Sequence, residues 1–328
     1  MQIVITGAAG FLGKKLARAI LEQEGVAIDG DYRPLERLRL VDLEAPADVS
    51  TDPRVEALGV DLTAPGALAR VVDPATDVVF HLAAVVSAAA EADFDLGMAV
   101  NLQATMDLLE TCRSLPEPPR LVFASSVAVY GGPVVAGTIT DTTHLVPQTS
   151  YGVQKAAGEL LVMDYHRKGF VDGRSLRLPT IVVRPGRPNK AASTWASSII
   201  REPLAGAAAV CPVSRETAMF VLSPRKVVDA FLHAADLEST ALGVDRTIQL
   251  PGTTFTVAEM LATLEQVAGA QVAARVRFEP DETIQRICDG WARTFETARA
   301  RKLGFRADAS FREIVEAHIE DELGGRVA

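Results

Sequence analysis

The stretch QIVITGAAGFLG (2–13) decides the fold, because it joins a short apolar run to a glycine loop and to the start of a helical pattern. In such a strand–loop–helix unit the first glycine allows a tight turn and the second lets the backbone approach a pyrophosphate. The third lets the helix pack closely on the sheet. The helix N-terminus adds free N–H groups and a positive dipole. The stretch therefore predicts a dinucleotide site, lined by Gly7, Gly10, Phe11, Leu12 and Gly13.

Apolar, β-branched runs continue to alternate with helical patterns along the first half of the chain. We expect strands at 2–6, 38–42, 58–61, 77–84, 120–126, 175–183 and 246–250, and helices at 11–24, 64–72, 89–114 and 151–168. Nearly continuous apolar strands that alternate with helices indicate a parallel sheet covered on both faces. The predicted fold class is α/β, a Rossmann-type doubly wound parallel sheet with a smaller, mostly helical C-terminal lobe.

The pattern changes after about residue 184, where the loop RPGRPNKAAS (184–193) is followed by helical segments with clear start signals. Ser223 before Pro224 is typical of an N-cap followed by proline at the first helical position. Thr256 with Glu259, and Ser310 with Glu313, have the spacing of capping boxes. We predict a nucleotide-binding domain of residues 1–183, to which 223–250 return. Residues 184–222 and 251–328 would form a substrate-binding lobe.

The composition narrows the range of partners and of cellular locations. The chain has 328 residues with 48% hydrophobic and 23% charged residues, and a formal net charge of −9. An acidic surface argues against nucleic acid or an anionic membrane as the main partner. The cysteines Cys112, Cys211 and Cys288 are too few and too scattered for a disulfide framework or a zinc site. With no apolar run of bilayer length and no secretory signal after Met1, we predict a cytoplasmic protein without a metal.

Asp42 ends the second predicted strand of the sheet, where a carboxylate can bind the ribose of adenosine. It would repel a 2′-phosphate, which favours NAD over NADP. A carboxylate that is merely solvated at a strand end is the alternative, and Arg33, Arg37 and Arg39 leave acceptance of NADP open. Asp61 and Leu62 follow the next strand and are expected to contact the adenine.

Four motifs in order resemble the extended short-chain dehydrogenase/reductase family, also described as the NAD-dependent epimerase/dehydratase family. They are the glycine loop, HLAAVVS (81–87), ASSVAVYG (124–131) and Tyr151-x-x-x-Lys155. The resemblance covers nearly the whole chain and implies a Rossmann domain that carries NAD. It also extends the expected cofactor contacts to Leu82, Ala83, Ala84, Ser125, Tyr151, Lys155, Pro179 and Ile181.

Tyr151 and Lys155 lie one helical turn apart, which suits an acid–base pair. A free phenol has a pKa near ~10, and an adjacent ammonium group stabilises the phenolate and lowers that value. The resemblance implies that Ser126 hydrogen-bonds the reacting oxygen and that Asn101 holds a proton-relay water. For Asn101 the alternative is an ordinary solvated side chain. His81 is expected to be a structural contact near the cofactor.

Several segments resemble the D-erythronate dehydrogenase group of this family. They are HLAAVVSAAAEADFD (81–95), SYGVQKAAGELL (150–161), LRLPTIVVRPGRPN (176–189), REPLAGAAAVCPVSR (201–215) and LSPR (222–225). The resemblance implies oxidation of the C2 hydroxyl of a small sugar acid by NAD. Arginine binds a carboxylate with two parallel hydrogen bonds, so we expect at least one of Arg184, Arg215 and Arg225 to face the pocket. Asn189 is a further candidate for the carboxylate, and Ser87 for a substrate hydroxyl.

Other activities stay open at this stage. Dehydration is disfavoured, because Ser126 is followed by Val127-Ala128-Val129 and not by carboxylates. A nucleotide-sugar 4-epimerase that retains NAD would use the same residues, although Thr180 stands where many epimerases have asparagine. AMFVL (218–222) would also suit a larger apolar alcohol. A redox-sensing regulator that only binds the dinucleotide is the non-enzymatic alternative, but such proteins usually lack the Tyr–Lys pair. The resemblance further implies a homodimer formed through 89–114 and 151–168.

Overall fold

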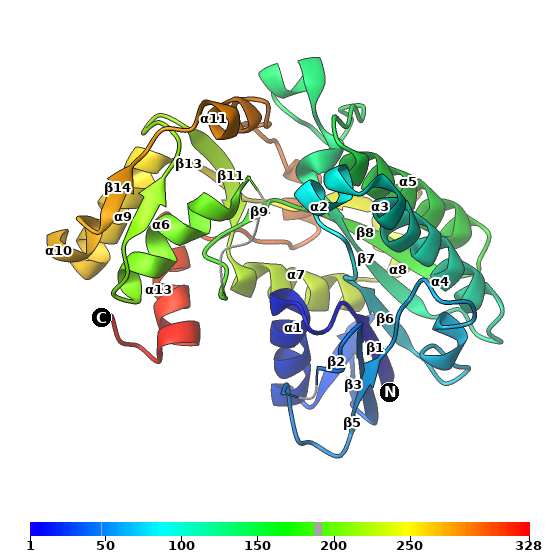
Figure 1. The fold of residues 1–328 in the computed structure, drawn as a ribbon. Coiled ribbons are helices and arrows are strands. Elements are labelled where there is room, and N and C mark those ends of the chain that lie inside the picture. The colour runs from blue at the N-terminus through cyan, green and yellow to red at the C-terminus, as the bar shows by residue number, and fades with distance from the viewer. Residues whose placement is uncertain (47, 187–191) are drawn as a thin grey trace.

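The computed structural model of the chain describes residues 1–46, 48–186 and 192–328 (Figure 1). Its main sheet has seven parallel strands in the order β12-β8-β7-β6-β1-β4-β5. The strands are β1 (Gln2–Thr6), β4 (Arg37–Asp42), β5 (Val55–Gly59), β6 (Val78–His81), β7 (Arg120–Ser126), β8 (Asp172–Leu178) and β12 (Thr247–Gln249). The strand order changes direction at β1, which opens a crevice at the carboxyl ends of β1 and β6. The predicted α/β fold class is confirmed.

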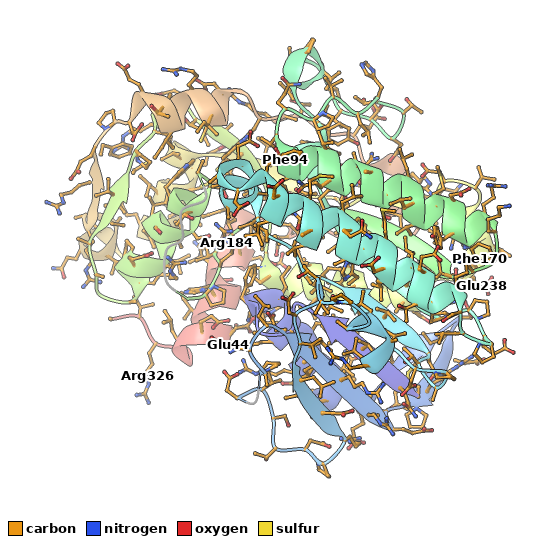
Figure 2. The ribbon with its side chains drawn as sticks, turned by 45° about the vertical axis from the view of Figure 1, so that its right-hand side comes forward. Glu44, Phe94, Phe170, Arg184, Glu238 and Arg326 are labelled. Carbon is orange, nitrogen blue, oxygen red and sulfur yellow. The ribbon has the colours of Figure 1, made fainter. Side chains whose placement is uncertain are left out.

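Helices cover both faces of this sheet, as the apolar strands require. Ile3 and Ile5 of β1 pack in one core with α1 (Phe11–Glu22) and α7 (Pro224–Asp236). Val4 points to the other face and packs in a second core with α4 (Ala104–Arg113) and α5 (Ser150–Arg167). Figure 2 shows α4 and α5 side by side on the outside of the molecule. Within the described ranges, no helix is both long and apolar enough to cross a membrane.

Two predicted helices are not formed as expected. Residues 64–72 contain a single 3-10 turn, η1 (Leu68–Arg70), because Pro65-Gly66 and Pro74 leave too short a segment for an α-helix. The expected helix 89–114 is divided into α2 (Ser87–Ala92), α3 (Phe94–Gly97), the π-helix η2 (Met98–Gln103) and α4. The first break lies at Asp93, whose backbone is extended and whose side chain caps the N–H of Leu96.

The long interval between the glycine loop and Asp42 is occupied by a hairpin that the sequence did not reveal. Strands β2 (Gly25–Ile28) and β3 (Asp31–Pro34) form it. The predicted strand 175–183 is likewise corrected, since β8 ends at Leu178 and β9 (Thr180–Ile181) joins another sheet. Pro179 lies between them and lacks the N–H group that a continuous strand would need.

The C-terminal part is built from helices and two small sheets around a third core. Its strands are β11 (Ala218–Leu222) and β13 (Thr253–Thr256) beside β9, and β10 (Ala209–Cys211) beside β14 (Val276–Phe278). Its helices include α6 (Thr194–Leu204), α9 (Val257–Ala268), α10 (Ala270–Ala273), α11 (Glu282–Asp289) and α13 (Phe311–Leu323). Short elements elsewhere are η3 (Val127–Val129), η4 (Gly132–Ala136), α8 (Ser239–Leu242) and α12 (Ala298–Lys302). The two-part division of the chain stays a prediction.

The helix starts agree well with the N-cap signals. Ser223 caps α7 by accepting from the N–H of Lys226, and Thr256 with Glu259 forms a complete capping box at α9. Ser310 caps α13, but the Glu313 carboxylate accepts from Ala309 N, so the reciprocal half of that box is displaced by one residue.

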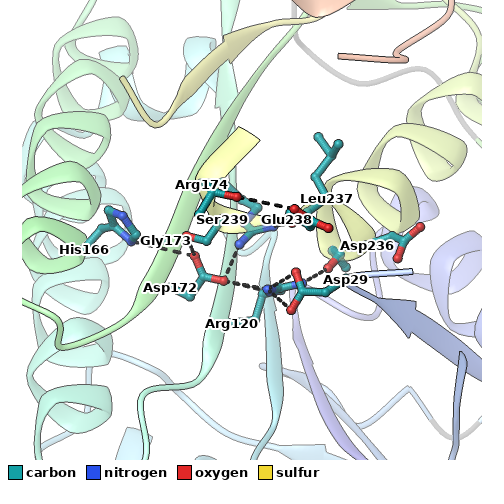
Figure 3. Close-up of polar contacts among 12 residues, drawn as sticks. Asp29, Arg120, His166, Asp172, Gly173, Arg174, Asp236, Leu237, Glu238 and Ser239 are labelled. Atoms are coloured by element: carbon teal, nitrogen blue, oxygen red, sulfur yellow. Dashed lines mark hydrogen bonds and ion pairs between the residues drawn. The ribbon is translucent and has the colours of Figure 1, made fainter. Parts of the chain in front are cut away.

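A group of buried charges ties the amino ends of three strands to the end of α7 (Figure 3). Asp172, the first residue of β8, forms ion pairs with Arg120, Arg174 and Arg246. Arg174 also donates through Nη1 to Ala234 O at 2.6 Å, near the carboxyl end of α7. Cations at that end complement the helix dipole. The group therefore fixes α7 against the amino edge of the sheet.

Candidate active site

A cavity of about 930 Å³ runs along the carboxyl ends of the central strands. Every residue predicted for the cofactor lines it: Gly7, Gly10, Phe11, Leu12, Gly13, Asp42, Asp61, Leu62, Leu82, Ala83, Ala84, Ser125, Tyr151, Lys155, Pro179 and Ile181. Ser126 lines it as well, and so do side chains of the C-terminal part such as Met219, Phe220 and Trp291. One continuous cavity thus joins the glycine loop to the Ser126–Tyr151–Lys155 group.

The glycine loop has the geometry of an anion cradle. Gly7 has a φ of +73°, and an added Cβ would lie 2.6 Å from Ala83 N. A Cβ at Gly13 would lie 2.5 Å from Gly7 O, so both glycines permit a close approach of backbones. Helix α1 begins at Phe11 with no side-chain cap, which leaves the first N–H groups of the helix without intrahelical acceptors. These N–H groups fit the pyrophosphate of a dinucleotide.

The cavity lining near the glycine loop includes the carboxylate of Asp42. It does not include Arg33, Arg37 or Arg39, the arginines that left the acceptance of NADP open in the sequence. Asp42 lines the cavity and accepts the N–H of Ala9 through Oδ2 at 2.9 Å. Arg39 is buried in ion pairs outside the cavity, and Arg33 and Arg37 do not line it either. The described lining therefore supports a ribose diol at Asp42 and offers no arginine there for a 2′-phosphate.

Ser126 and Tyr151 meet because the end of β7 faces the start of α5. Ser126 is the last residue of β7, and Tyr151 is the second residue of α5, whose N-cap Thr149 accepts the N–H of Gly152 at 3.1 Å. Tyr151 and Ser126 share a side-chain hydrogen bond. Lys155 lies one turn further along α5, with its Nζ 5.7 Å from the centroid of the Tyr151 ring. The three side chains form one compact polar group inside the cavity.

Burial dominates the electrostatics of this group. It raises the pKa of Tyr151 to about 12, although the hydrogen bond with Ser126 acts in the other direction. Burial also lowers the pKa of Lys155 to about 7, opposed by the carboxylate of Glu159. Tyr151 is therefore a neutral phenol here, and its ionisation requires additional positive charge close by.

Asn101 lies on η2, in the helical segment after β6, and behind the cavity lining. Its side chain is 1% exposed and does not line the cavity. Its Oδ1 accepts Val85 N at 2.8 Å, and its Nδ2 donates to Val85 O at 2.9 Å and to Gln154 Oε1 at 2.8 Å. Both N–H bonds of the side chain are used within the protein, and the proton-relay role of Asn101 stays a prediction. Asn101 holds the backbone of Val85, which does line the cavity.

His81 has the structural role expected of it. Its Nδ1 lies 2.7 Å from Thr6 Oγ1 and its Nε2 lies 3.0 Å from Thr105 Oγ1. Thr105 Oγ1 donates to Asn101 O, so it accepts from the Nε2–H of His81, and Thr6 donates to Nδ1. Burial lowers the pKa of His81 to about 3, assisted by the charge of Lys155. The imidazole is therefore neutral and links β1, β6 and α4.

The predicted substrate residues separate into two groups. Arg184 and Ser87 line the cavity, as does Ser126, whereas Arg215 and Arg225 do not. Arg215 lies over the ring of Phe278 at 4.6 Å, and Arg225 is paired with Glu320 and Asp321 of α13. Of the three candidate arginines, Arg184 is therefore the one that lines the described cavity, and the described lining gives no support to a substrate contact by Arg215 or Arg225. Asn189 lies outside the described residues.

Arg184 is an arginine of the cavity lining, and Figure 2 labels its position. No carboxylate of the described residues forms an ion pair with its guanidinium. The charged group that affects the pKa of Arg184 is the guanidinium of Arg201. Burial lowers the pKa of Arg184, and the positive charge of Arg201 lowers it further. A half-buried cation without a counterion favours the binding of an anion.

One cavity residue with obvious chemistry was missed by the sequence analysis. Glu91 of α2 lines the cavity, and its Oε2 accepts the N–H of Ser150 at 2.9 Å, at the start of α5. Its carboxylate can accept hydrogen bonds from substrate hydroxyls. Glu91 could have been predicted from the sequence, because it follows the candidate Ser87 by four residues and residues i and i+4 of a helix share a face.

Comparison with known proteins agrees with this geometry. The model of the NAD dependent epimerase/dehydratase family matches residues 3–242. The chain belongs to this family. It is 52% identical to D-erythronate dehydrogenase of Cupriavidus necator, over 98% of each chain, and 45% identical to D-erythronate dehydrogenase of Haemophilus influenzae, over 98% of this chain and 100% of the relative. The crystal structure of a nucleoside-diphosphate-sugar epimerase from Agrobacterium tumefaciens has a TM-score of 0.94 and 45% identity, covering 100% of this chain and 96% of the other.

These comparisons confirm the family predicted from the four motifs and the likeness to D-erythronate dehydrogenases. The protein is an NAD-dependent dehydrogenase, and NAD is its cofactor. The glycine loop, Asp42 and the lining between them provide the chemistry that NAD requires.

Proposed function

We propose that the protein oxidises the C2 hydroxyl of D-erythronate to the 2-oxo acid. The observation that carries the proposal is Arg184, whose guanidinium has no carboxylate partner among the described residues and lies in the cavity that holds Ser126, Tyr151 and Lys155. A substrate carboxylate would supply the missing counterion. Ser87 and Glu91, on the same cavity wall, would receive the remaining hydroxyls of a polyhydroxy acid. The two relatives named D-erythronate dehydrogenase support the choice of a four-carbon acid.

The proposed mechanism uses three side chains at the end of the cavity. Ser126 donates a hydrogen bond to the substrate oxygen, and Tyr151 as phenolate removes the hydroxyl proton. Lys155 stabilises that phenolate with its positive charge. When bound, NAD accepts the hydride that leaves C2, and its oxidised ring carries a positive charge. That charge would act in the direction opposite to burial, which alone holds the pKa of Tyr151 at about 12.

We assign the cofactor contacts to the residues predicted from the sequence. The N–H groups at the start of α1 would bind the pyrophosphate, and Asp42 would bind the adenosine ribose. Asp61 and Leu62 would contact the adenine. Since Asp42 is the charged side chain at that position, we expect a preference for NAD over NADP.

A nucleotide-sugar epimerase is the second candidate, and the name of the Agrobacterium relative favours it. A nucleotide sugar carries a diphosphate of its own, which usually requires several cations. Among the described residues that line the substrate end, Arg184 is the one arginine, and Lys155 is already used by Tyr151. Arg177 is paired with Glu159 outside the lining. The cavity therefore suits a small acid better.

A dehydrogenase of a larger apolar alcohol is the third candidate. Met219, Phe220, Ile287 and Trp291 form an apolar wall of the cavity, and Ile287 remains exposed. This wall would accept an apolar tail, whereas Arg184 would remain without a counterion. The charge of Arg184 therefore favours the acid over an apolar alcohol.

The test is the formation of NADH by the purified protein with NAD and a panel of alcohols. The panel contains D-erythronate, its stereoisomers, 2-hydroxybutyrate and one apolar secondary alcohol. We expect oxidation of D-erythronate, its loss in Tyr151→Phe, and a KM increase of about tenfold or more in Arg184→Gln with a smaller effect on kcat. The matched control is Arg225→Gln, which should leave KM unchanged. Activity with the apolar alcohol alone would refute the acid, and activity with none would favour the epimerase.

We also propose that the protein is a homodimer that associates through α4 and α5. Phe94, Met106, Val153 and Leu160 are exposed apolar side chains of α3, α4 and α5, and Figure 2 labels Phe94 among them. Burying them in a partner copy would remove apolar area from water. Sedimentation of the parent and of Leu160→Glu would test this, with a monomeric variant as the expected result.

A cytoplasmic location is consistent with the cysteines, because Cys112, Cys211 and Cys288 are all free and buried. We keep this location, and the two-part division into a nucleotide-binding domain and a substrate lobe, as proposals. Limited proteolysis near residues 184–193 would test whether the two parts separate there.

A further inference from the structure

Glu159 and Arg177 form a buried ion pair next to Lys155. Glu159 is one helical turn after Lys155 on α5 and is 3% exposed. Arg177 of β8 donates to it through Nε at 2.9 Å and through Nη2 at 2.7 Å, one bond to each carboxylate oxygen. Neither side chain lines the cavity. A buried pair of this kind often adds little stability over apolar residues of the same size, so stability alone does not account for it.

This pair touches the cavity lining at two points. The hydroxyl of Ser125 donates to Oε1 of Glu159, and Arg177 Nη1 donates to the hydroxyl of Tyr130 at 2.6 Å. The Arg177 guanidinium also lies 5.2 Å from the centroid of the Tyr130 ring. Ser125 and Tyr130 both line the cavity, on either side of η3. Glu159 and Arg177 thus contact the cavity lining through Ser125 and Tyr130, while their own charged groups stay outside the lining.

The groups around Lys155 come from three elements. On α5 it has Tyr151 before it and Glu159 after it, and on β6 it faces the neutral His81. The ring of Phe123 on β7 lies 4.7 Å from its Nζ and carries no charge. Glu159 is the carboxylate that acts on Lys155, and Arg177 holds that carboxylate in place. Lys155 and Arg177 therefore share the carboxylate of Glu159 as their counterion.

We propose that Glu159 and Arg177 are positioning residues that hold Lys155 and Ser125 for proton transfer at Tyr151. Glu159 supplies the negative charge that keeps the Lys155 ammonium in a buried site, and Arg177 limits how much of that charge Lys155 receives. The proposal extends the proposed function, because it concerns the same Tyr151 and Lys155. Its first test nevertheless needs no substrate.

The first experiment follows the protonation of Lys155 directly by NMR on protein labelled with carbon-13 at the lysine side chains. The Lys155 signal is assigned by its loss in Lys155→Met. Removal of a nearby charge shifts a buried group by about one pH unit or more. In Glu159→Gln the titration midpoint should move to lower pH, and in Arg177→Met it should move to higher pH. The double variant should lie between the two single variants.

The controls separate this role from a general effect on folding. Glu56→Gln removes a carboxylate from Arg39 in an ion pair outside the cavity, and should leave the Lys155 midpoint unchanged. Glu159→Asp keeps the negative charge but places it farther from Lys155, because aspartate is one methylene shorter. The Lys155 midpoint should therefore shift less than in Glu159→Gln, and in the same direction. Glu159→Asp also keeps the test possible if the glutamine variant does not fold. Midpoints that stay within about 0.2 pH units of the parent, or that move in the same direction in both single variants, would overturn the proposal.

The second experiment measures kcat/KM for the hydroxy acid against pH. Since the charged form of Lys155 is the active one, the decline at high pH should begin earlier in Glu159→Gln and later in Arg177→Met. If the parent shows no activity with D-erythronate, the proposed function has failed, while the NMR result still decides the present inference. Equal losses of activity with no displacement of the profile would assign the pair a structural role only.

Discussion

Asp172→Asn tests the idea that one carboxylate stabilises three buried guanidinium groups (Figure 3). Asp172 is paired with Arg120, Arg174 and Arg246, whose side chains are 9%, 0% and 1% exposed. Asparagine preserves the size of the side chain and its bond with Ser239, but it removes the negative charge. In Asp172→Asn the carboxylate of Asp29, which is partly exposed, still pairs with Arg120, whereas Arg174 and Arg246 lose the carboxylate of Asp172.

The size of the effect follows from the cost of leaving a buried charge without its partner, which is about 3–5 kcal/mol. Unfolding entropy of about 2.1 cal/mol/K per residue, taken over the 328 residues, is about 0.7 kcal/mol/K. The expected fall in Tm is therefore about 4–7 °C. Burial alone would raise the pKa of Asp172, but Arg174 and Arg120 hold it below the ordinary value of 3.8. The stabilisation is thus complete above that value and is lost as the pH falls through the lower, folded-state pKa.

Differential scanning calorimetry of the parent and of Asp172→Asn at neutral pH measures this loss, and a series at acid pH should show the difference shrinking. Asp164→Asn is the matched control, because Asp164 and Arg167 form an exposed pair on α5 that contributes at most about 0.5 kcal/mol. NADH formation should be retained in both variants at room temperature, since Asp172 lies at the amino edge of the sheet. A Tm for Asp172→Asn within the shift of the control would refute the reasoning.

Three other outcomes are expected. Ser126→Ala should lower kcat by about a hundredfold with little change in NAD affinity, because one hydrogen bond to the reacting oxygen is lost; a normal kcat in steady-state assays would remove Ser126 from the mechanism. Asp42→Ser should raise the ratio of kcat/KM with NADP to that with NAD by at least about tenfold, because like-charge repulsion is removed; an unchanged ratio would place the ribose elsewhere. Stability of the parent should fall as the pH drops from 6.5 towards 3, because the unfolded chain protonates His81 while the folded chain keeps it neutral; acid denaturation should begin at lower pH in His81→Gln, and an unchanged onset would contradict this.

Local rules explain why most of the site could be predicted. The glycine spacing, the strand ends and the i, i+4 relation of Tyr151 and Lys155 each depend on a few consecutive residues. Parallel strands then bring their carboxyl ends to one edge of the sheet, which gathers all of these residues along one cavity. The predicted helix 64–72 failed because prolines and a glycine interrupted it, which a closer reading of the same residues could have found.

Which arginine is free to bind a substrate was decided only by the tertiary structure. Arg225 and Arg184 look alike in the sequence, but α13 brings Glu320 and Asp321 to Arg225 from almost a hundred residues away. No carboxylate of the described residues comes to Arg184 in the same way. Asn101 is a similar case, since Val85 and Gln154 occupy its amide. The sequence by itself determined the fold class, the cofactor loop and the Ser–Tyr–Lys group through short-range spacing. The availability of a charge depends on partners distant in the chain, which only the folded structure brings together.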